Sequence, residues 1–227
     1  MSHETSRVPG SGLHQSRRIR LGISACLLGD EVRHDGGHKR DAYLIDVLGP
    51  LVEWVRVCPE VEIGMGTPRE PIRLVDESGR IRLLSVTTRV DHTASMAAYA
   101  ARRADALAAE DLSGLILKTD SPSCGMIGVK VHTAEGRATR TGVGLFAQAL
   151  LARFPDLPIE EEGRLADPQR REQFLERVFD YQSRGAQGAQ GSQGAQGAQG
   201  AQGAQGAQGA QGAQGARDAT TREPREP

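Results

Sequence analysis

The stretch Leu115-Ile116-Leu117-Lys118-Thr119-Asp120-Ser121-Pro122-Ser123-Cys124-Gly125 indicates how this chain is organised. Its first three residues form a short apolar run, which predicts a buried strand. The residues that follow combine hydroxyls, a thiol, a proline and a glycine, and this mixture suits neither a helix nor the interior of a strand. We therefore predict a rigid loop that presents polar groups at the end of a strand.

The other two cysteines of the chain also follow apolar runs. Cys26 comes after the run at residues 20–25, and Cys58 comes after residues 55–57. The three cysteines are 32 and 66 residues apart, so they have no CxxC spacing. Helical patterns separate the predicted strands, which favours a parallel sheet with helices on both faces. Because ligands bind beyond the carboxyl ends of such strands, we expect the three thiols to meet at one edge of the sheet.

The rest of the chain carries further helix and strand patterns. Apolar residues at helical spacing predict a helix from about residue 38 to residue 55, which Pro50 should kink or split after Gly49. Turn residues between two strand-like runs predict a β-hairpin over residues 72–85. Other helices are expected at residues 91–111, 145–154 and 167–181, and other strands at residues 126–132 and 157–159. The predicted fold is α/β, with three layers, a mostly parallel sheet covered by helices on both faces, and a β-hairpin.

Composition divides the 227 residues into three parts. Residues 1–18 are polar and lack the apolar core of a signal peptide, which predicts a disordered leader. Residues 19–183 are expected to form one α/β domain with a sizeable core. Residues 184–227 contain a Gly-Ala-Gln repeat with the glycine period of collagen but no proline within it, so we predict a disordered tail.

Bulk composition excludes several classes of function. The net charge is -1 and aromatic residues make up 4% of the chain, so we expect neither direct nucleic-acid binding nor attraction to a membrane surface. No apolar run reaches the roughly 18 residues that a membrane-spanning helix needs. An odd number of cysteines cannot form a closed set of disulfides, which favours a reducing, cytoplasmic compartment.

Three thiolates at one sheet edge suit three interpretations. They could hold an iron–sulfur cluster, with one iron left open because a 4Fe-4S cluster normally takes four cysteines. They could bind zinc together with His34, His38 or a water molecule. They could also be small buried side chains that bind nothing. The residue types and their spacing leave these alternatives open.

Polar residues near the cysteines are candidates for the remaining chemistry. A carboxylate in a partly closed pocket can act as a general base or acid, and a hydroxyl can orient a substrate or a water molecule. Each residue also has an ordinary interpretation as a turn residue or a solvated charge. The candidates are Ser24, Asp35, Lys39, Glu60, Arg69, Ser121 and Ser123.

Five ordered motifs surround the cysteines and the polar candidates. They are Ser24-Ala25-Cys26-Leu27-Leu28-Gly29, Val32-Arg33-His34-Asp35-Gly36, Cys58-Pro59-Glu60-Val61, Thr67-Pro68-Arg69 and Ser121-Pro122-Ser123-Cys124-Gly125. Together they resemble the motifs of one small bacterial family, long catalogued as a domain of unknown function, which includes the thiouracil desulfidases. The resemblance covers about residues 20–181. It implies that Cys26, Cys58 and Cys124 hold a 4Fe-4S cluster in which one iron lacks a protein ligand.

The resemblance also implies a reaction. The open iron would take the sulfur of a small thiocarbonyl substrate such as 2-thiouracil, and water would attack the carbon, which releases uracil and sulfide without net electron transfer. Glu60 is expected to activate water or transfer a proton, Ser121 to hold the substrate, and Asp35 to assist. The remaining polar candidates are expected to line the substrate site: Ser24, Lys39, Arg69 and Ser123. The alternative is an iron–sulfur or zinc binding module without catalysis, such as a redox or sulfur sensor.

Residues 144–179 resemble a subgroup of this family that usually carries a second, helical domain. In this chain the Gly-Ala-Gln tail stands where that domain is expected. We therefore expect that a separate partner could replace the missing domain.

Overall fold

The computed structural model describes residues 18–133 and 135–194. Nearly all of the predicted leader and most of the predicted tail therefore lie outside the described residues. In chain order, the elements are β1 (Ile19–Ser24), η1 (Ala25–Leu28), η2 (Tyr43–Leu48), η3 (Gly49–Leu51), β2 (Val52–Val57), α1 (Pro59–Glu62), β3 (Ile72–Glu77), β4 (Arg80–Ser85), α2 (Thr93–Ala108), β5 (Gly114–Leu117), β6 (Val129–His132), β7 (Ala138–Gly142), α3 (Leu145–Arg153), β8 (Ile159–Glu161) and α4 (Pro168–Gly194).

The first sheet consists of four parallel strands in the order β2-β1-β5-β8. In the register of β1 with β2, Ser24 lies opposite Val57, so the two strands end at the same level. Strand β5 pairs with the other side of β1, with Ile116 opposite Ile23. The prediction that the three strands before the cysteines are parallel neighbours is therefore confirmed.

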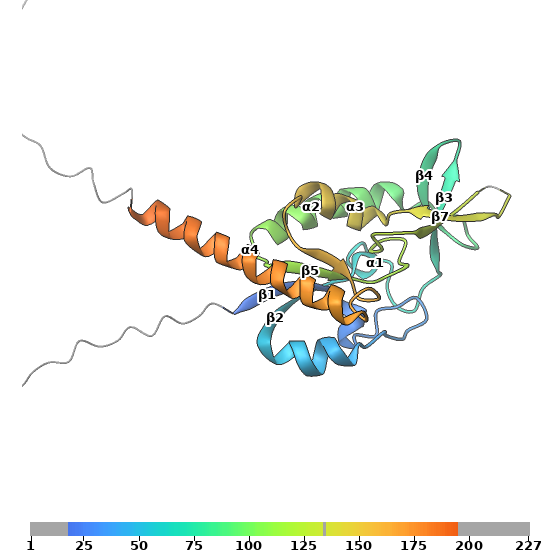
Figure 1. Cartoon of the computed structure of the whole chain (residues 1–227). Coiled ribbons are helices and arrows are strands. Elements are labelled where there is room, and N and C mark those ends of the chain that lie inside the picture. The colour runs from blue at the N-terminus through green and yellow to red at the C-terminus, as the bar shows by residue number, and fades with distance from the viewer. Residues whose placement is uncertain (1–17, 134, 195–227) are drawn as a thin grey trace, which may run out of the picture. The chain divides into compact units, whose positions relative to one another are not determined.

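Helices cover both faces of this sheet, as predicted. Successive residues of a strand point to opposite faces, and Leu115 and Leu117 belong to one core cluster while Ile116 belongs to the other. Helices α2 and α3 pack on the first cluster, and Figure 1 shows them together along one side of β5. The second cluster includes Phe174 of α4 and Leu44 of η2. Strand β5 is thus an apolar run because one helical layer covers each of its two faces.

A second sheet has the order β4-β3-β6-β7, and Figure 1 shows β3, β4 and β7 gathered at one end of the domain. The predicted hairpin is confirmed as the antiparallel pair β3–β4. It is joined to a second hairpin, β6–β7, through a short parallel pairing of β3 with β6. The sequence did not predict β7 or this second sheet, because residues 138–142 are largely exposed and have no alternation of apolar and polar residues.

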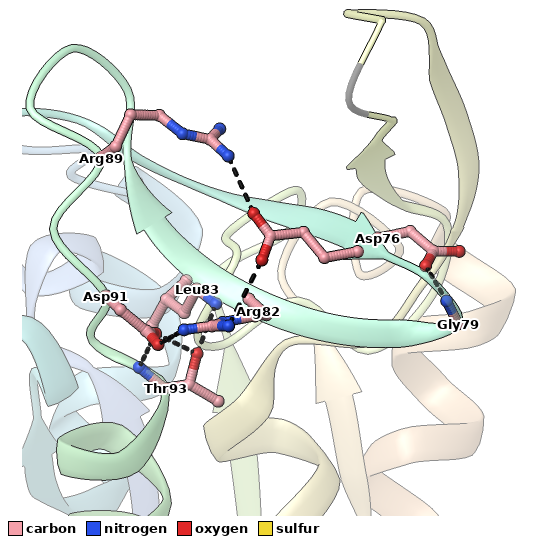
Figure 2. Close-up of polar contacts among 8 residues, drawn as sticks. Asp76, Gly79, Arg82, Leu83, Arg89, Asp91 and Thr93 are labelled. Atoms are coloured by element: carbon pink, nitrogen blue, oxygen red, sulfur yellow. Dashed lines mark hydrogen bonds and ion pairs between the residues drawn. The ribbon is translucent and has the colours of Figure 1, made fainter.

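Local polar contacts hold the β3–β4 hairpin and attach it to the start of α2, as Figure 2 shows. The amide of Gly79 donates to Asp76 Oδ1 over 2.7 Å and closes the turn. Asp91 Oδ1 accepts from the Thr93 amide over 2.9 Å, and Arg82 donates to the other carboxylate oxygen of Asp91. Hydrogen bonds from Thr93, with a contribution from Arg82, lower the pKa of Asp91 to about 2.

The helix predicted from about residue 38 to residue 55 is wrong at both ends. A π-type helix, η2, begins at Tyr43 and ends at Leu48, and a single 3-10 turn follows at Gly49–Leu51. Strand β2 already begins at Val52. Residues 52–57 also fit a strand, since Val52, Val55 and Val57 are buried and the residues between them are more exposed. Pro50 does divide the helical segment after Leu48, close to the predicted position.

Two further helices differ from the prediction. Helix α1, at Pro59–Glu62, was not predicted from the sequence. Helix α4 continues past the predicted end at Tyr181 to Gly194, so the first part of the predicted disordered tail is helical. Extending an existing helix needs no new nucleus, and alanine and glutamine are good helix formers. Within the described ranges, no helix is both long and apolar enough to cross a membrane.

Candidate active site

The three cysteines meet at the carboxyl edge of the first sheet. Cys26 lies in η1 directly after β1, Cys58 lies between β2 and α1, and Cys124 lies in the loop after β5. All three line one cavity of about 390 Å³. They are free thiols, with Cys124 buried and the other two half-buried. The parallel arrangement of the three strands thus brings together thiols that are far apart in the sequence.

Burial raises the pKa of each thiol. The pKa of Cys26 rises to about 11, although the positive charge of Lys118 opposes the shift. The pKa of Cys58 rises to about 12 because burial is reinforced by the negative charge of Glu60. Burial and Glu60 also raise the pKa of Cys124 well above its ordinary value. Burial thus favours the neutral form of each thiol, and binding of a metal or cluster has to displace its proton.

Glu60 is the carboxylate that lies among the thiols. Pro59 occupies the first position of α1, where its missing N–H costs no helical hydrogen bond, and Glu60 follows in the first turn. The Glu60 side chain lines the cavity, and its Oε2 atom is 3.8 Å from Cys58 Sγ. Its negative charge acts on all three cysteines. Two positions further on, Glu62 accepts a 2.9 Å hydrogen bond from the Cys58 amide and so fixes the backbone of this cysteine.

The Ser121 side chain organises the loop that carries Cys124. Ser121 Oγ accepts hydrogen bonds from the amides of Ser123, over 3.2 Å, and Cys124, over 3.0 Å. The amide of Gly125 donates to the Ser121 carbonyl, and a Cβ at Gly125 would lie 2.8 Å from that oxygen, so only glycine fits there. Ser121 also lines the cavity. Because its oxygen is the acceptor in both loop contacts, its own O–H remains able to donate into the cavity.

Ser24 and Ser123 occupy different environments, although both were predicted to contact the substrate. Ser24 Oγ accepts from the Lys118 amide over 3.0 Å, which links the ends of β1 and β5. The Ser24 hydroxyl also hydrogen-bonds Cys124, which lowers the pKa of that thiol against the effect of burial. Ser123 is fully buried and does not line the cavity. Among the described residues, its hydroxyl has no hydrogen-bond partner.

Arg69 attaches the loop of residues 30–39 to the rest of the site. Its guanidinium donates to the Val32 carbonyl over 2.8 Å and to the Gly66 carbonyl over 2.9 Å. Its backbone amide donates to the His34 carbonyl over 2.8 Å. Arg69 lines the cavity, and so does Lys39 at the end of the loop. The two cations therefore lie at the rim, and Arg69 also fixes the loop.

Asp35 lies outside the cavity, contrary to the expectation that it assists catalysis. Its side chain is 54% exposed and pairs with Arg33 over 3.6 Å. Asp35 Oδ1 also accepts a 3.1 Å hydrogen bond from the Gly37 amide, which lowers the pKa of the carboxyl. This aspartate closes its own turn, as aspartates commonly do in loops with glycine.

The cavity thus gathers most of the predicted site residues and adds others. Lys118, which the sequence analysis did not single out, lines it and forms an ion pair with Glu162. Its position in the sequence could have identified Lys118 as a site residue, because it is the first residue after a buried parallel strand. The predicted site residues that line the cavity are Ser24, Cys26, Lys39, Cys58, Glu60, Arg69, Ser121 and Cys124.

The donor set of the cavity fits an iron–sulfur cluster better than a single zinc ion. His34 lines the cavity, but His38 does not, and its Nδ1 atom accepts from the Arg40 amide. In the described part of the chain, no three His, Cys, Asp or Glu side chains are grouped as ligands of one metal ion. In a cluster each cysteine binds a different iron, so the sulfur atoms need not converge on one point. Soft thiolates are the ligands that such clusters select.

Comparisons with known proteins agree with this geometry. YbbK, an uncharacterized protein of Bacillus subtilis strain 168, is 32% identical over 133 residues, which span 56% of this chain and 87% of YbbK. The solved structure of TudS, a [4Fe-4S]-dependent thiouracil desulfidase, superposes with a TM-score of 0.52 at 30% identity and covers 65% of this chain and 93% of TudS. The family model for 2-thiouracil desulfurase matches residues 21–162, a region that contains all three cysteines and the cavity. This chain therefore belongs to the 2-thiouracil desulfurase family.

Proposed function

We propose that this chain removes sulfur from a thiocarbonyl compound, such as a thiolated pyrimidine, using a 4Fe-4S cluster held by Cys26, Cys58 and Cys124. The observation that carries the proposal is that thiols from three adjacent strand ends line one cavity together with a buried carboxylate. Membership of the 2-thiouracil desulfurase family and the likeness to TudS support it. We assign the activity to residues 19–183, and the free thiols suit the reducing compartment predicted from the sequence.

The proposed reaction exchanges the sulfur of the substrate for an oxygen of water. The carbon–sulfur double bond breaks, a carbon–oxygen double bond forms, and sulfide leaves with the protons of the water, so no electrons are gained or lost. A cluster with one iron free of protein ligands would supply a Lewis acid and an acceptor for the substrate sulfur. The residues around the cavity have to bind the substrate, position the water and move its protons.

Glu60 is the proposed proton carrier. Its carboxylate is only 9% exposed and lies beside Cys58, so it can meet a water molecule held in the cavity. In its ionised form it accepts a proton from the attacking water, and in its protonated form it returns that proton to the departing sulfide. Groups in this role typically contribute a factor of about 10² to 10⁴ in rate.

Ser121 is the proposed substrate ligand, and Ser24 supports the cluster ligand. Two loop amides donate to Ser121 Oγ, so the O–H of Ser121 remains able to donate into the cavity. A ring heteroatom or a carbonyl of the substrate can accept that hydrogen bond. Ser24 contacts Cys124, so we revise its role from substrate binding to stabilising that thiolate. We likewise propose that Asp35 stabilises its loop, and that Lys39 and Arg69 remain candidates for substrate contact at the rim.

Anaerobic reconstitution followed by a sulfide-release assay tests the proposal. We expect about four irons per chain and sulfide release from 2-thiouracil or a thiouridine, with uracil or uridine as the other product. The cluster-free chain is the control and should release no sulfide. A chain that binds no iron under these conditions overturns the proposal. A chain that binds the cluster but releases sulfide from none of these compounds favours the alternative of a sensor or binding module.

A further inference from the structure

Three consecutive glutamates at the end of β8 are almost fully buried, and the proposed reaction uses none of them. Strand β8 pairs with β5, the strand that leads into the Cys124 loop. Glu160 is 8% exposed and Glu161 is 2% exposed, and the side chain of Glu162 is 10% exposed. Buried carboxylates are costly unless they are paired or hydrogen-bonded, so the partners of these three side chains indicate what they do.

Glu162 binds the beginning of the Cys124 loop. Its Oε1 atom pairs with the Lys118 ammonium. Its Oε2 atom accepts from the Thr119 amide over 2.6 Å and from the Thr119 hydroxyl over 3.1 Å. The Thr119 hydroxyl oxygen in turn accepts from the Gly163 amide over 3.0 Å. Both carboxylate oxygens of Glu162 are therefore occupied by donors from the first two residues after β5.

Glu161 binds the end of the same loop. Its Oε1 atom accepts from the Met126 amide over 2.6 Å and from the Ile127 amide over 3.4 Å. Cys124 lies two residues before Met126, so the two carboxylates hold the loop on both sides of the thiol. All the described donors reach a single oxygen of Glu161, whereas those of Glu162 use both oxygens.

Helix α3 holds the middle of the loop. The amides of Phe146 and Ala147 donate to the Ser123 carbonyl over 3.0 Å each, and the Leu145 amide donates to the Pro122 carbonyl over 3.2 Å. These amides belong to the first turn of the helix, where the backbone N–H groups have no acceptor within the helix itself. The loop is thus fixed at its start by Glu162, in its middle by α3, and at its end by Glu161.

We propose that Glu161 and Glu162 are positioning residues that hold the Cys124 loop in its binding geometry, and that they act by different chemistry. Glu161 does not need its charge for this role, because the amide oxygen of a glutamine can accept from the same two backbone N–H groups. Glu162 needs its charge and both oxygens, because an amide nitrogen would face a donor at one of the two positions. The link to the cluster rests on the proposed function, whereas the link to Cys124 itself does not.

The first test measures how readily Cys124 of the cluster-free, full-length chain is alkylated by iodoacetamide, with mass spectrometry of its peptide. Hydrogen bonds to charged groups are strong enough that losing them should open the loop roughly tenfold more often. We expect Glu162→Gln and Glu161→Ala to raise the alkylation rate of Cys124 by about that factor. We expect Glu161→Gln to leave the rate at the parent value. The half-buried Cys58 is the internal reference in each sample, because the groups that shift the pKa of its thiol are Glu60, Val61, Arg69 and Cys26 rather than the substituted glutamates.

Glu160→Gln is the matched control. Glu160 is also buried on the same strand, but its side chain pairs with Arg164 over 2.8 Å and Arg177 over 3.8 Å and accepts from the Glu161 amide over 3.1 Å. Among the described residues, none of these contacts reaches the loop. Glu160→Gln should leave the alkylation of Cys124 unchanged. If the alkylation rate of Cys124 rises equally in Glu160→Gln and Glu162→Gln, the substitutions loosen the region in general and the proposal is overturned. The proposal is also overturned if the rate in Glu162→Gln does not rise above that of the parent chain. If Glu161→Ala does not fold, the comparison of Glu161→Gln with Glu162→Gln decides alone.

Iron content after anaerobic reconstitution provides the second readout. Glu162→Gln should retain less iron than the parent chain, and Glu161→Gln should retain as much as the parent. If the parent chain itself binds no iron, the proposed function fails, but the alkylation series still tests the positioning role. If the parent binds iron and Glu162→Gln exposes Cys124 without losing any iron, the link between the loop and the cluster is wrong.

Discussion

The two sheets of this domain have the same number of strands but opposite relations to function. The β2-β1-β5-β8 sheet is parallel, is covered by helices on both faces, and carries the cysteines at its carboxyl edge. The β4-β3-β6-β7 sheet is assembled from two hairpins. It packs one face into the core cluster through Leu74, Leu83, Val129 and Val131, and polar contacts attach its β3–β4 hairpin to the start of α2. Of its described residues, Ile72 at the start of β3 lines the cavity, next to Arg69 and Pro71 in the preceding loop.

This difference follows from how each sheet is connected. Parallel strands need long crossovers, so residues distant in sequence end at the same edge, and a site can draw one side chain from each. A hairpin brings together only residues that are already close along the chain. We therefore expect substitutions at the parallel edge to change iron binding and catalysis, and substitutions in the hairpin sheet to change stability alone.

Replacing Cys124 should have the largest effect. Cys124→Ser keeps the size of the side chain but removes the soft thiolate that iron–sulfur clusters select. We expect iron to fall from about four per chain to well below one after anaerobic reconstitution, and sulfide release to be lost with it. The free energy of unfolding of the cluster-free chain, measured with urea, should fall by at most about 1–3 kcal/mol, because a hydroxyl replaces the buried thiol. Full iron content in this variant would contradict the assignment of Cys124 as a ligand.

Glu60→Gln should separate catalysis from cluster binding. The substitution keeps the shape of the side chain but removes its ability to take and return a proton. We expect kcat for sulfide release to fall by about 10² to 10⁴, while iron content stays at the parent level. The matched control is Glu77→Gln in the hairpin sheet, where Glu77 pairs with Arg82 and Arg89 on the surface. Equal activity of Glu60→Gln and Glu77→Gln would exclude a catalytic role for Glu60.

Alanine substitutions at two glycines, one beside the Cys124 loop and one in the hairpin sheet, test whether backbone changes near each sheet affect iron binding differently. A Cβ at Gly144 would overlap the Ser123 carbonyl, next to Cys124, so Gly144→Ala has to displace the Cys124 loop or α3. We expect it to cost about 1–3 kcal/mol of unfolding free energy and to reduce iron retention. Gly79, in the β3–β4 turn, has φ +82° and open space around it, so Gly79→Ala should cost about 1–2 kcal/mol from backbone strain alone. Its iron content should match the parent, and a comparable loss of iron in both variants would remove the distinction between the sheets.

The sequence predicted the functional edge better than it predicted the second sheet. Short apolar runs before Cys26 and Cys124 identified β1 and β5, because burial on both faces leaves a strong signal. The strand before Cys58 was identified by Val55 and Val57, although β2 is only partly buried. The strand β7 left no such signal, since its residues are exposed. The boundary between η3 and β2 was missed because Val52 fits the helical and the strand period equally well.

Residue type singled out the cysteines and Glu60, which do line the cavity, but it could not tell apart the positions of the serines. Ser121 and Ser123 are two positions apart in the same loop, yet Ser121 lines the cavity and Ser123 is buried away from it. Glu161 and Glu162 could not be linked to the Cys124 loop either, because they lie more than thirty residues along the chain and contact it only through the pairing of β8 with β5. Such contacts depend on tertiary register, which no local pattern contains.

Asp91→Asn should have the smallest effect and a characteristic pH dependence. The folded pKa of Asp91, about 2, is below its value of about 3.9 in an unfolded chain, so the carboxylate stabilises the fold above about pH 4. That contribution is lost as the pH falls through about 2, where the folded chain also binds the proton. Because the side chain is 35% exposed and paired at the surface, the asparagine variant should lose only about 1 kcal/mol at neutral pH. The difference in unfolding free energy between parent and variant should shrink toward pH 2, while iron content and sulfide release at neutral pH stay unchanged. A difference that grows on acidification would mean that Asp91 is not held as a carboxylate by Thr93 and Arg82.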